Sequence, residues 1–445
     1  MASMTGREYD VVLFGATGFT GRLVAEHLVQ RAPEDFRIAL AGRSLAKLAA
    51  VRDGLGSRAT DWPLMLADSA NRPTLAKLAR SAVAVASTVG PYTKHGLPLV
   101  EACARAGTHY VDLTGEVLFM RRSIDACHDL AVASGARIVH SCGFDSIPSD
   151  LGVLVLHEAA GELADTTLLV RDLRGGLSGG TLASMRAEME ARSADPIGRE
   201  VAADPYALSP DRAAEPDRAA EFYWSTEPEG EADPGAESDA RSFDVTGAVH
   251  DPELGWLGPF VMAESNTRVV RRSNALAGYP YSRRFRYREA MAFGEGVTAR
   301  AKATGMASGL GALTAAMGFG PTRAGIGRVM PKPGEGPSPE DRAAGHFRME
   351  IHGTGPDESR WVATVAAQGD PGYAATSLML AESVLLAASG DPDLPDRAGV
   401  LTPATGFGRP LVERLRAAGM TFEAGPWDPD AQTAPGPDSP SEPGD

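Results

Sequence analysis

Two stretches of this sequence place polar side chains directly after apolar, strand-like segments. Tyr92 and His95 follow the segment at 83–87, and Asp145 follows the segment at 137–141. Ligands of open parallel sheets bind beyond the carboxyl ends of the strands, so these side chains are expected at a ligand site. A phenol, an imidazole or a carboxyl group there can protonate or polarise a bound substrate. Tyr92, His95 and Asp145 are therefore the predicted catalytic residues.

Each catalytic candidate also has a purely structural interpretation. Tyr92 could pack in a core instead of facing a substrate. Asp112, Glu116 and Asp145 all lie near strand ends, where carboxylates equally serve as helix caps and turn formers. No tyrosine is followed four residues later by a lysine, so the YxxxK pair of short-chain dehydrogenases is absent. The sequence therefore leaves the proton donor unassigned.

A glycine-rich turn near the N-terminus joins an apolar run at 11–14 to a helical pattern. The turn consists of Gly15, Ala16, Thr17, Gly18, Phe19, Thr20 and Gly21. Its three glycines omit Cβ atoms where the turn is tight, where backbone approaches a pyrophosphate and where helix meets strand. The N-terminus of the following helix attracts phosphate through its N–H groups and dipole. The GxxGxxG spacing, common in NADP-binding reductases, predicts a dinucleotide site.

The next strand-like run, 36–41, ends without the carboxylate that an NAD enzyme uses to hold the ribose 2′-hydroxyl. Arg43 and Ser44 follow it instead and could bind a 2′-phosphate, although Arg43 could also simply begin the next helix. We therefore predict NADP(H). Asp68 ends the third strand-like run and could meet the adenine edge or, equally, cap the helix that follows.

The loop after the fourth strand-like run is predicted to line the same cofactor site. It lies where the order of strands in a doubly wound sheet reverses, next to the nicotinamide position. A Gly-Pro turn in this loop should hold Tyr92 beside the nicotinamide. The loop residues assigned to the cofactor are Thr88, Val89, Gly90 and Pro91.

Composition and charge limit the function classes. The 445 residues are 43% hydrophobic and 23% charged, which is ordinary for a soluble globular protein long enough for two domains. The net charge of −15 argues against nucleic-acid binding, which needs a basic surface. The three cysteines, Cys103, Cys127 and Cys142, form no CxxC pair and favour a reducing, cytoplasmic compartment. Cys142 is better explained as a small buried residue than as a nucleophile, and no metal site is predicted.

The order of elements predicts an α/β protein with a Rossmann-type, doubly wound parallel sheet. An inserted α+β domain with a mixed or antiparallel sheet should follow, because alternating patterns appear at 284–288, 346–352 and 360–367. We expect this second domain to hold the substrate and the contact of a homodimer. The predicted divisions are 1–150 for the NADP-binding domain, 151–375 for the second domain with an acidic excursion at 203–255, 376–425 for a return onto the first domain, and 426–445 for a disordered tail.

Several long motifs, in this order and spacing, resemble the saccharopine-dehydrogenase-like oxidoreductase family. They are GATGFTG, AGRS, STVGPY, HYVDLTGE and CGFDSIPSDLG, and the likeness continues through FVMAESNTRVVRRSNAL and GVLTPATGFGRPLVERLRAAGMTFE. Within the family, the likeness is greatest to actinobacterial trans-acting enoyl reductases, and it covers nearly the whole chain. His95 departs from the pattern, because a tyrosine is expected there in relatives.

The resemblance implies an NADPH-dependent reductase that delivers hydride to the enoyl group of a long-chain polyketide or lipid thioester. The substrate would be presented in trans by a carrier protein or polyketide synthase. Two other functions stay open at this point. One is a saccharopine- or opine-like reduction of a C=N bond, and the other is a non-catalytic NADP-binding, lipid-associated scaffold.

Two features of the second domain bear on partners. Arg268, Arg271 and Arg272 belong to a basic segment of an acidic protein, and they could face an acidic carrier or its phosphopantetheine phosphate. Alternatively, arginines of this segment could neutralise neighbouring Asp and Glu residues. The uncharged stretch 304–321 could cover a greasy substrate or make peripheral contact with a membrane, or it could be a packed Gly/Ala segment.

Overall fold

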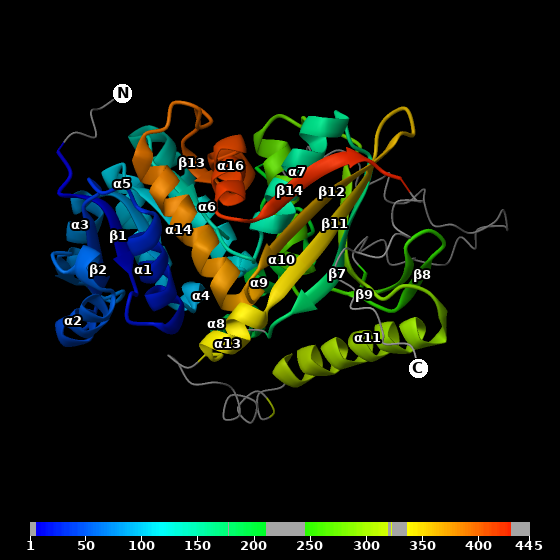
Figure 1. Cartoon of the computed structure of the whole chain (residues 1–445), viewed down its shortest axis with the longest axis horizontal. Coiled ribbons are helices and arrows are strands. Elements are labelled where there is room, and N and C mark those ends of the chain that lie inside the picture. Colours follow the sequence, from blue (N-terminus) through cyan, green and yellow to red (C-terminus); the bar gives the residue numbers. More distant parts are fainter. Residues whose placement is uncertain (1–5, 177, 211–244, 319–321, 323–335, 429–445) are drawn as a thin grey trace, which may run out of the picture.

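The computed structural model describes residues 6–176, 178–210, 245–318, 322 and 336–428. These residues form two seven-stranded sheets that lie side by side, with helices around both (Figure 1). The first sheet is parallel throughout and the second is mixed. The predicted combination of a Rossmann-type sheet with a mixed second sheet is confirmed.

The first sheet has the strand order of a doubly wound fold. From edge to edge the strands are β13 (Gly399–Leu401), β6 (Arg137–Val139), β5 (His109–Asp112), β4 (Ala82–Ser87), β1 (Tyr9–Phe14), β2 (Ile38–Gly42) and β3 (Leu64–Leu66). The central strands are short apolar runs buried on both faces, as parallel sheets require. The chain winds outward from β1 to β3 and then returns to β4 on the other side of β1. Loops after β1 and β4 therefore diverge at this switch point, where a ligand binds.

Helices cover both faces of the parallel sheet. One face carries α3 (Arg72–Ser81), α5 (Leu97–Ala106) and α6 (Val117–Ser134), which pack against one another. The other face carries α1 (Phe19–Arg31) and α14 (Thr376–Ser389), which lie alongside each other in Figure 1. The shorter α2 (Leu45–Gly54) and α4 (Tyr92–His95) follow β2 and β4.

The second sheet receives strands from distant parts of the chain. Its order is β14 (Thr421–Pro426), β12 (Arg360–Gln368), β11 (His346–Thr354), β7 (Asp165–Arg174), β10 (Arg286–Ala292), β9 (Gly255–Pro259) and β8 (Val249–Asp251). Only the pair β7 and β10 is parallel among the strands described. Helix α7 (Ile147–Ala160) packs on β11, β12 and β14, and α10 (Ala263–Leu276) packs on β10. These two helices also contact each other, so they connect the second sheet to the first.

The C-terminal segment divides between the two sheets. Helix α14 and strand β13 join the parallel sheet, whereas β14 pairs with β12 in the mixed sheet. Helices α15 (Pro403–Gly406) and α16 (Arg409–Ala417) lie between them in the chain. Residues 211–244 of the predicted acidic excursion and 429–445 of the predicted tail lie outside the described residues.

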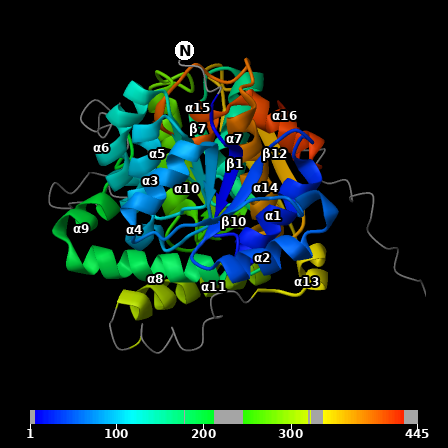
Figure 2. The same ribbon diagram turned by 90° about the vertical axis from the view of Figure 1, so that its left-hand side faces the viewer.

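Two long helices pack against each other, and the second of them lies below the mixed sheet in the view of Figure 1. Helix α8 (Gly179–Ala194) contacts α4 and α11 (Gly296–Gly318), and Figure 2 shows α11 below α8. The uncharged stretch at 304–318 is thus helical; the rest of the predicted stretch lies outside the described residues. The remaining helices are α9 (Pro196–Ala203), α13 (Pro339–Ala344) and the single turns Ser57–Ala59 and Pro371–Ala375. In the described part of the chain, one helical segment, Pro371–Ser389, is long and apolar enough to cross a membrane, and 72% of its apolar window is buried in the core.

Candidate functional site

The glycine-rich turn between β1 and α1 has the backbone shape of a phosphate cradle. A Cβ on Gly21 would collide with the carbonyl oxygen of Gly15, and Gly15 itself has a φ of +98°. The N–H of Gly18 donates to the Gly15 carbonyl at 2.9 Å, which closes the turn before α1 begins. The N-terminus of this thirteen-residue helix is therefore available for a pyrophosphate. The turn fits a dinucleotide without rearrangement.

The residues predicted to meet the ribose phosphate and the adenine follow β2 and β3. Ser44 caps α2 by accepting the Lys47 N–H, and Arg43 is exposed immediately before it. Arg43 therefore precedes the helix and does not begin it. Asp68 accepts the N–H of Ala70 at 2.9 Å, whereas Asn71 caps α3. The helix-cap interpretation of Asp68 is wrong, and its contact with adenine stays a prediction.

The loop after β4 is tied to the glycine-rich turn. The N–H of Thr88 donates to the carbonyl of Phe14 at 3.0 Å, and its hydroxyl donates to the carbonyl of Gly15 at 3.2 Å. Val89 is half-buried and Gly90 is exposed. The two predicted cofactor loops thus form one continuous surface at the switch point.

Tyr92 does not face this surface. Its side chain is 4% exposed, and its hydroxyl donates to the carbonyl of Ser87 at 2.9 Å and accepts the N–H of Leu113 at 3.3 Å. Burial, followed by the charge of Asp112, holds the pKa of the phenol well above its usual range. The expectation that Tyr92 lies beside the nicotinamide as a proton donor is corrected: this side chain joins the ends of β4 and β5 from within.

His95 lies on the outside of the short helix α4. It is exposed, like Lys94 beside it, which forms an ion pair with Glu190 of α8 at 2.8 Å. In the described part of the chain, no hydrogen bond or ion pair joins His95 to Tyr92 or Asp145. The structure therefore does not assemble the three predicted catalytic residues into one group.

Asp145 lies at the ligand edge of the parallel sheet. It follows β6, and its carboxylate lies against the backbone of two loops: a Cβ on Gly115 would be 3.4 Å from Oδ1, and one on Gly143 would be 3.1 Å from Oδ2. Burial, with further contributions from the charges of Asp112 and Glu116, raises the pKa of Asp145 to about 7. Near neutral pH this carboxyl group can therefore hold and release a proton.

Asp112 and Glu116, the two other carboxylates predicted near the site, have structural partners. Asp112 is buried and bonds His140 Nδ1 at 2.8 Å, and it accepts the N–H of Ser141 at 3.2 Å. Glu116 is also buried and accepts the N–H groups of Tyr92 at 2.8 Å and Thr93 at 2.6 Å. The Asp112 and Glu116 carboxylates thus stabilise the loops. Of the three carboxylates predicted near the site, Asp145 is the one that is partly exposed at the ligand edge of the sheet.

Sequence reasoning missed a serine that lies close to Asp145. Ser265, in the first turn of α10, is 5% exposed, and its hydroxyl has no hydrogen-bond partner among the residues described. A Cβ on Gly115 would lie 3.8 Å from this hydroxyl. Ser265 lies in the motif FVMAESNTRVVRRSNAL, which is part of the family resemblance. Only the fold shows that it lies close to Gly115, in the loop after β5.

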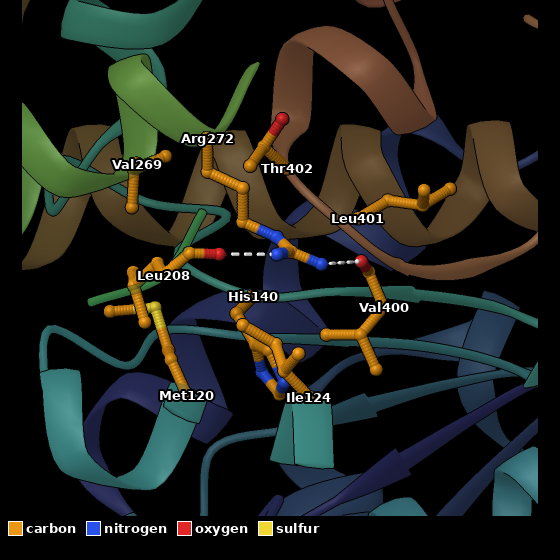
Figure 3. A pocket seen from close by; sticks show the side chains of 9 residues that line it. All are labelled: Met120, Ile124, His140, Leu208, Val269, Arg272, Val400, Leu401 and Thr402. Carbon is orange, nitrogen blue, oxygen red and sulfur yellow. Dashed lines mark hydrogen bonds between the residues drawn. The ribbon is translucent and has the colours of Figure 1, made fainter. Parts of the chain in front are cut away.

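The three arginines expected to face a partner are buried in the protein. Arg268 donates to the carbonyls of Ala202 and Asp204, and Arg271 donates to the carbonyl of Tyr287. Figure 3 shows the guanidinium of Arg272 between two further carbonyls, those of Leu208 and Val400, at the edge of a small cavity. The prediction that these arginines form a docking face is wrong. Their side chains point into the protein, where they bind backbone carbonyls of segments that are distant in the sequence.

The same chain can now be compared with known proteins. Residues 11–139 match the family model of the saccharopine dehydrogenase NADP binding domain. A protein of Mycobacterium tuberculosis strain H37Rv is 47% identical over 432 residues, which cover 94% of this chain and 98% of the relative. The trans-acting enoyl reductase of Mycobacterium ulcerans is 44% identical over 440 residues, covering 95% and 99% of the two chains.

Among solved structures, the chain is similar to the saccharopine dehydrogenase (L-Glu forming) of Saccharomyces cerevisiae. It is 13% identical, with a TM-score of 0.49, and covers 94% of this chain and 99% of its own. The NADP-binding domain and the full-length relatives make this protein an NADP-dependent oxidoreductase. With 44% identity over nearly all of both chains, it belongs to the trans-acting enoyl reductases of the saccharopine-dehydrogenase-like family.

Proposed function

We propose that this protein reduces the C=C bond of a long-chain enoyl thioester with NADPH, and that Asp145 supplies the proton. The observation that carries the assignment of Asp145 is the position of its carboxyl group beside Gly115 at the ligand edge of the sheet, where burial also raises its pKa to about 7. The names of the relatives support the enoyl substrate. A long-chain polyketide or lipid intermediate, presented in trans by a synthase or its carrier, is the proposed form of that substrate.

The residues around Asp145 suit an acyl chain. Leu113, Phe144 and Met262 are each half-buried. A Cβ on Gly143 would contact both Leu113 and the Asp145 carboxylate, a Cβ on Gly115 would contact both Met262 and that carboxylate, and Phe144 precedes Asp145 in the chain. Phe144 is fixed by aromatic contacts with Phe260 and Phe347 of the second domain, with ring centroids 6.5 and 4.9 Å away. These walls are apolar, so they favour a hydrocarbon chain over a charged amino acid.

The chain's own residues divide the reaction between them. When bound, NADPH supplies the hydride that adds to the β-carbon of the enoyl group. The glycine-rich turn holds the pyrophosphate, and the loop from Thr88 to Pro91 orients the nicotinamide at the switch point. Asp145, whose raised pKa keeps a share of the molecules protonated near neutral pH, transfers its proton to the α-carbon and is then reprotonated from solvent.

A reduction of a C=N bond is not favoured. Saccharopine- or opine-like substrates carry carboxylates, which need exposed cations in the pocket. Arg268, Arg271 and Arg272 cannot serve in this way, because they donate to backbone carbonyls. The free, buried state of Cys103, Cys127 and Cys142 fits the proposed cytoplasmic location.

The test is oxidation of NADPH by the purified protein with a long-chain enoyl thioester, with identification of the saturated product. Asp145→Asn should lower kcat by about 10²- to 10⁴-fold, the range for removal of a general acid, and leave the Kd for NADPH unchanged. The rate of the wild type should fall above pH 7 as Asp145 loses its proton. A variant within threefold of the wild type would remove Asp145 from the mechanism.

A further inference from the structure

We propose that the space above Gly115 binds the carbonyl oxygen of the acyl thioester, and that the Ser265 hydroxyl donates a hydrogen bond to that oxygen. This inference rests on the proposed enoyl reduction and adds to it a residue that contacts the substrate. Ser265 would then stabilise the negative charge that reaches this oxygen when hydride adds to the β-carbon.

The geometry of the space comes from the missing side chain of Gly115. A Cβ at this position would lie 3.2 Å from Met262 Cε, 3.4 Å from Asp145 Oδ1 and 3.8 Å from Ser265 Oγ. The Asp145 carboxyl and the Ser265 hydroxyl thus approach one point from two elements, the loop after β6 and the first turn of α10. Gly115, Asp145 and Met262 are each partly exposed, whereas the Ser265 hydroxyl is buried, so a substrate oxygen would reach that hydroxyl from the Gly115 side by displacing the flexible end of Met262.

The Ser265 hydroxyl is a donor that the fold leaves unused. It is 95% buried and bonds no other group among the described residues, although buried hydroxyls are normally paired. Its neighbour Asn266, in contrast, is fully engaged: it accepts from Ser146 at 3.0 Å and donates to Glu289 at 2.9 Å. A substrate oxygen would give the unpaired hydroxyl its partner.

Helix α10 adds a favourable field at the same place. Ser265 is the third residue of this fourteen-residue helix, whose N-terminus carries a partial positive charge. The exposed Glu264 of the same turn is held in an ion pair with Arg192 of α8 at 2.5 Å. The dipole and the hydroxyl together favour an oxygen that gains negative charge.

Neighbouring carboxylates do not cancel this effect. Asp112 is bonded to His140 and Glu116 to backbone N–H groups, so their charges have local partners. The same two charges favour the neutral form of Asp145. A neutral Asp145 carboxyl group does not repel the negative charge that develops on the thioester oxygen. Once Asp145 has given up its proton, the substrate no longer carries that charge.

The assignment orders the bond changes of the reaction. The C–H bond of the bound NADPH breaks with its electron pair, which forms the new bond to the β-carbon, while the C=C electron pair moves toward the thioester oxygen held by Ser265. The O–H bond of Asp145 then breaks as its proton binds the α-carbon. The product is the saturated thioester, with NADP⁺ and the Asp145 carboxylate.

Activity measurements test Ser265 with a matched control. Ser265→Ala should lower kcat/KM for the enoyl thioester by about 10²- to 10³-fold, as for other oxyanion donors, without lowering Tm. Ser265→Thr, which keeps the hydroxyl, should recover part of the rate. Ser209→Ala is the control and should leave the rate unchanged, because Ser209 is likewise a buried serine, 1% exposed, whose hydroxyl has no partner among the described residues.

A binding measurement makes the test independent of turnover. The NADP⁺-loaded protein is titrated with a saturated long-chain acyl thioester of N-acetylcysteamine and with the matching thioether, which lacks the carbonyl oxygen. The wild type should prefer the thioester by at least tenfold, and Ser265→Ala should abolish that preference. Gly115→Ala, whose Cβ fits without touching backbone, should fill the space and do the same.

The two measurements separate this inference from the proposed function. Equal affinity of the wild type for thioester and thioether, or an unchanged preference in both variants, would overturn the role of Ser265 even if enoyl reduction is observed. A preference for the saturated thioester that depends on Ser265 would support the binding site even if the enoyl thioester does not oxidise NADPH. In that case the proposed enoyl reduction would be wrong and the binding site would stand.

Discussion

The carboxylate of Glu116 accepts the backbone N–H of Tyr92 at 2.8 Å, so the loop after β5 holds the helical turn that follows the nicotinamide loop. The same carboxylate accepts the N–H of Thr93 at 2.6 Å. One buried side chain thus satisfies the first two amides of α4. The position of the cofactor loop depends on this contact between neighbouring strands.

Replacing Glu116 by Gln should loosen the nicotinamide loop. The Gln amide can accept only through its oxygen, so one N–H of α4 loses its partner, and the free energy of unfolding should fall by about 1–3 kcal/mol. We expect a higher KM for NADPH, together with a lower pKa of Asp145 because a nearby charge is removed. The alkaline decline of the rate, which reports the loss of the Asp145 proton, should then begin at lower pH. Glu101→Gln, at an exposed ion pair with Arg72, is the control. It should leave the KM for NADPH and the pH dependence of the rate unchanged.

Glycine substitutions test the phosphate cradle. Gly21→Ala places a Cβ against the Gly15 carbonyl and should abolish NADPH binding, whereas Gly18→Ala, with its Cβ 3.3 Å from the same oxygen, should weaken it less. Gly54→Ala in α2 meets no atom within 4 Å and should stabilise the protein by about 0.5–1 kcal/mol. Fluorescence titration with NADPH and thermal unfolding report the two effects. Equal NADPH affinity in all three variants would contradict the assigned cradle.

Much of the parallel sheet could be predicted because its strands are short apolar runs followed by glycine or polar turns. β13 and β14 could not: Gly399–Leu401 is too short for a periodic pattern, and Thr421–Pro426 is partly exposed and contains Gly and Pro. Both strands form only because a sheet edge assembled from earlier segments receives them. The sequence of each strand by itself carries too little information.

The candidate site shows the same limit at the level of side chains. Asp145 could be predicted because it follows a strand, and Gly15 because its turn has a recognisable spacing. The burial of Arg272 could not be predicted, since the carbonyls of Leu208 and Val400 that bind it come from distant segments. Ser265 is significant only through its distance from Gly115, which the fold alone determines.

Arg43 should set the preference for NADPH over NADH. Its exposed guanidinium follows β2, where a 2′-phosphate would lie. Arg43→Ala should weaken NADPH binding by about 10- to 100-fold, which corresponds to a charge-assisted hydrogen bond of about 1.5–3 kcal/mol, and leave NADH binding unchanged. Titration with both nucleotides measures this ratio. Arg52→Ala, in the helix that follows Arg43 and paired with Asp53, is the control. Parallel losses of both nucleotides in Arg43→Ala would contradict the assignment.

The stability of the protein should depend on pH through Asp150. This carboxyl group is fully buried, accepts the N–H of Ala404 at 2.7 Å, and has its pKa raised by burial to about 7. An unfolded Asp has a pKa of about 3.9, so the folded state binds this proton more tightly. The free energy of unfolding should therefore fall as pH rises from about 4 through 7.

Asp150→Asn should flatten that dependence, because an amide does not titrate. Denaturant unfolding at several pH values provides the comparison, and Asp145 contributes a slope of the same sign that remains in the variant. Asp53→Asn, at a largely exposed carboxylate, should keep the slope of the wild type. An unchanged slope in Asp150→Asn would show that the buried carboxyl group titrates near its unfolded pKa.

Tyr92→Phe distinguishes a structural from a catalytic hydroxyl. The variant keeps the ring, which lies 5.6 Å from that of Phe119, and removes the bonds to the Ser87 carbonyl and the Leu113 N–H. Both partners are then left unsatisfied in a buried place, so the free energy of unfolding should fall by about 1–3 kcal/mol. The hydroxyl has no access to the substrate, so kcat should fall by less than about tenfold, well short of the loss expected for a general acid. A loss of about 10²-fold or more at unchanged NADPH affinity would instead return Tyr92 to the reaction and leave Asp145 as its support.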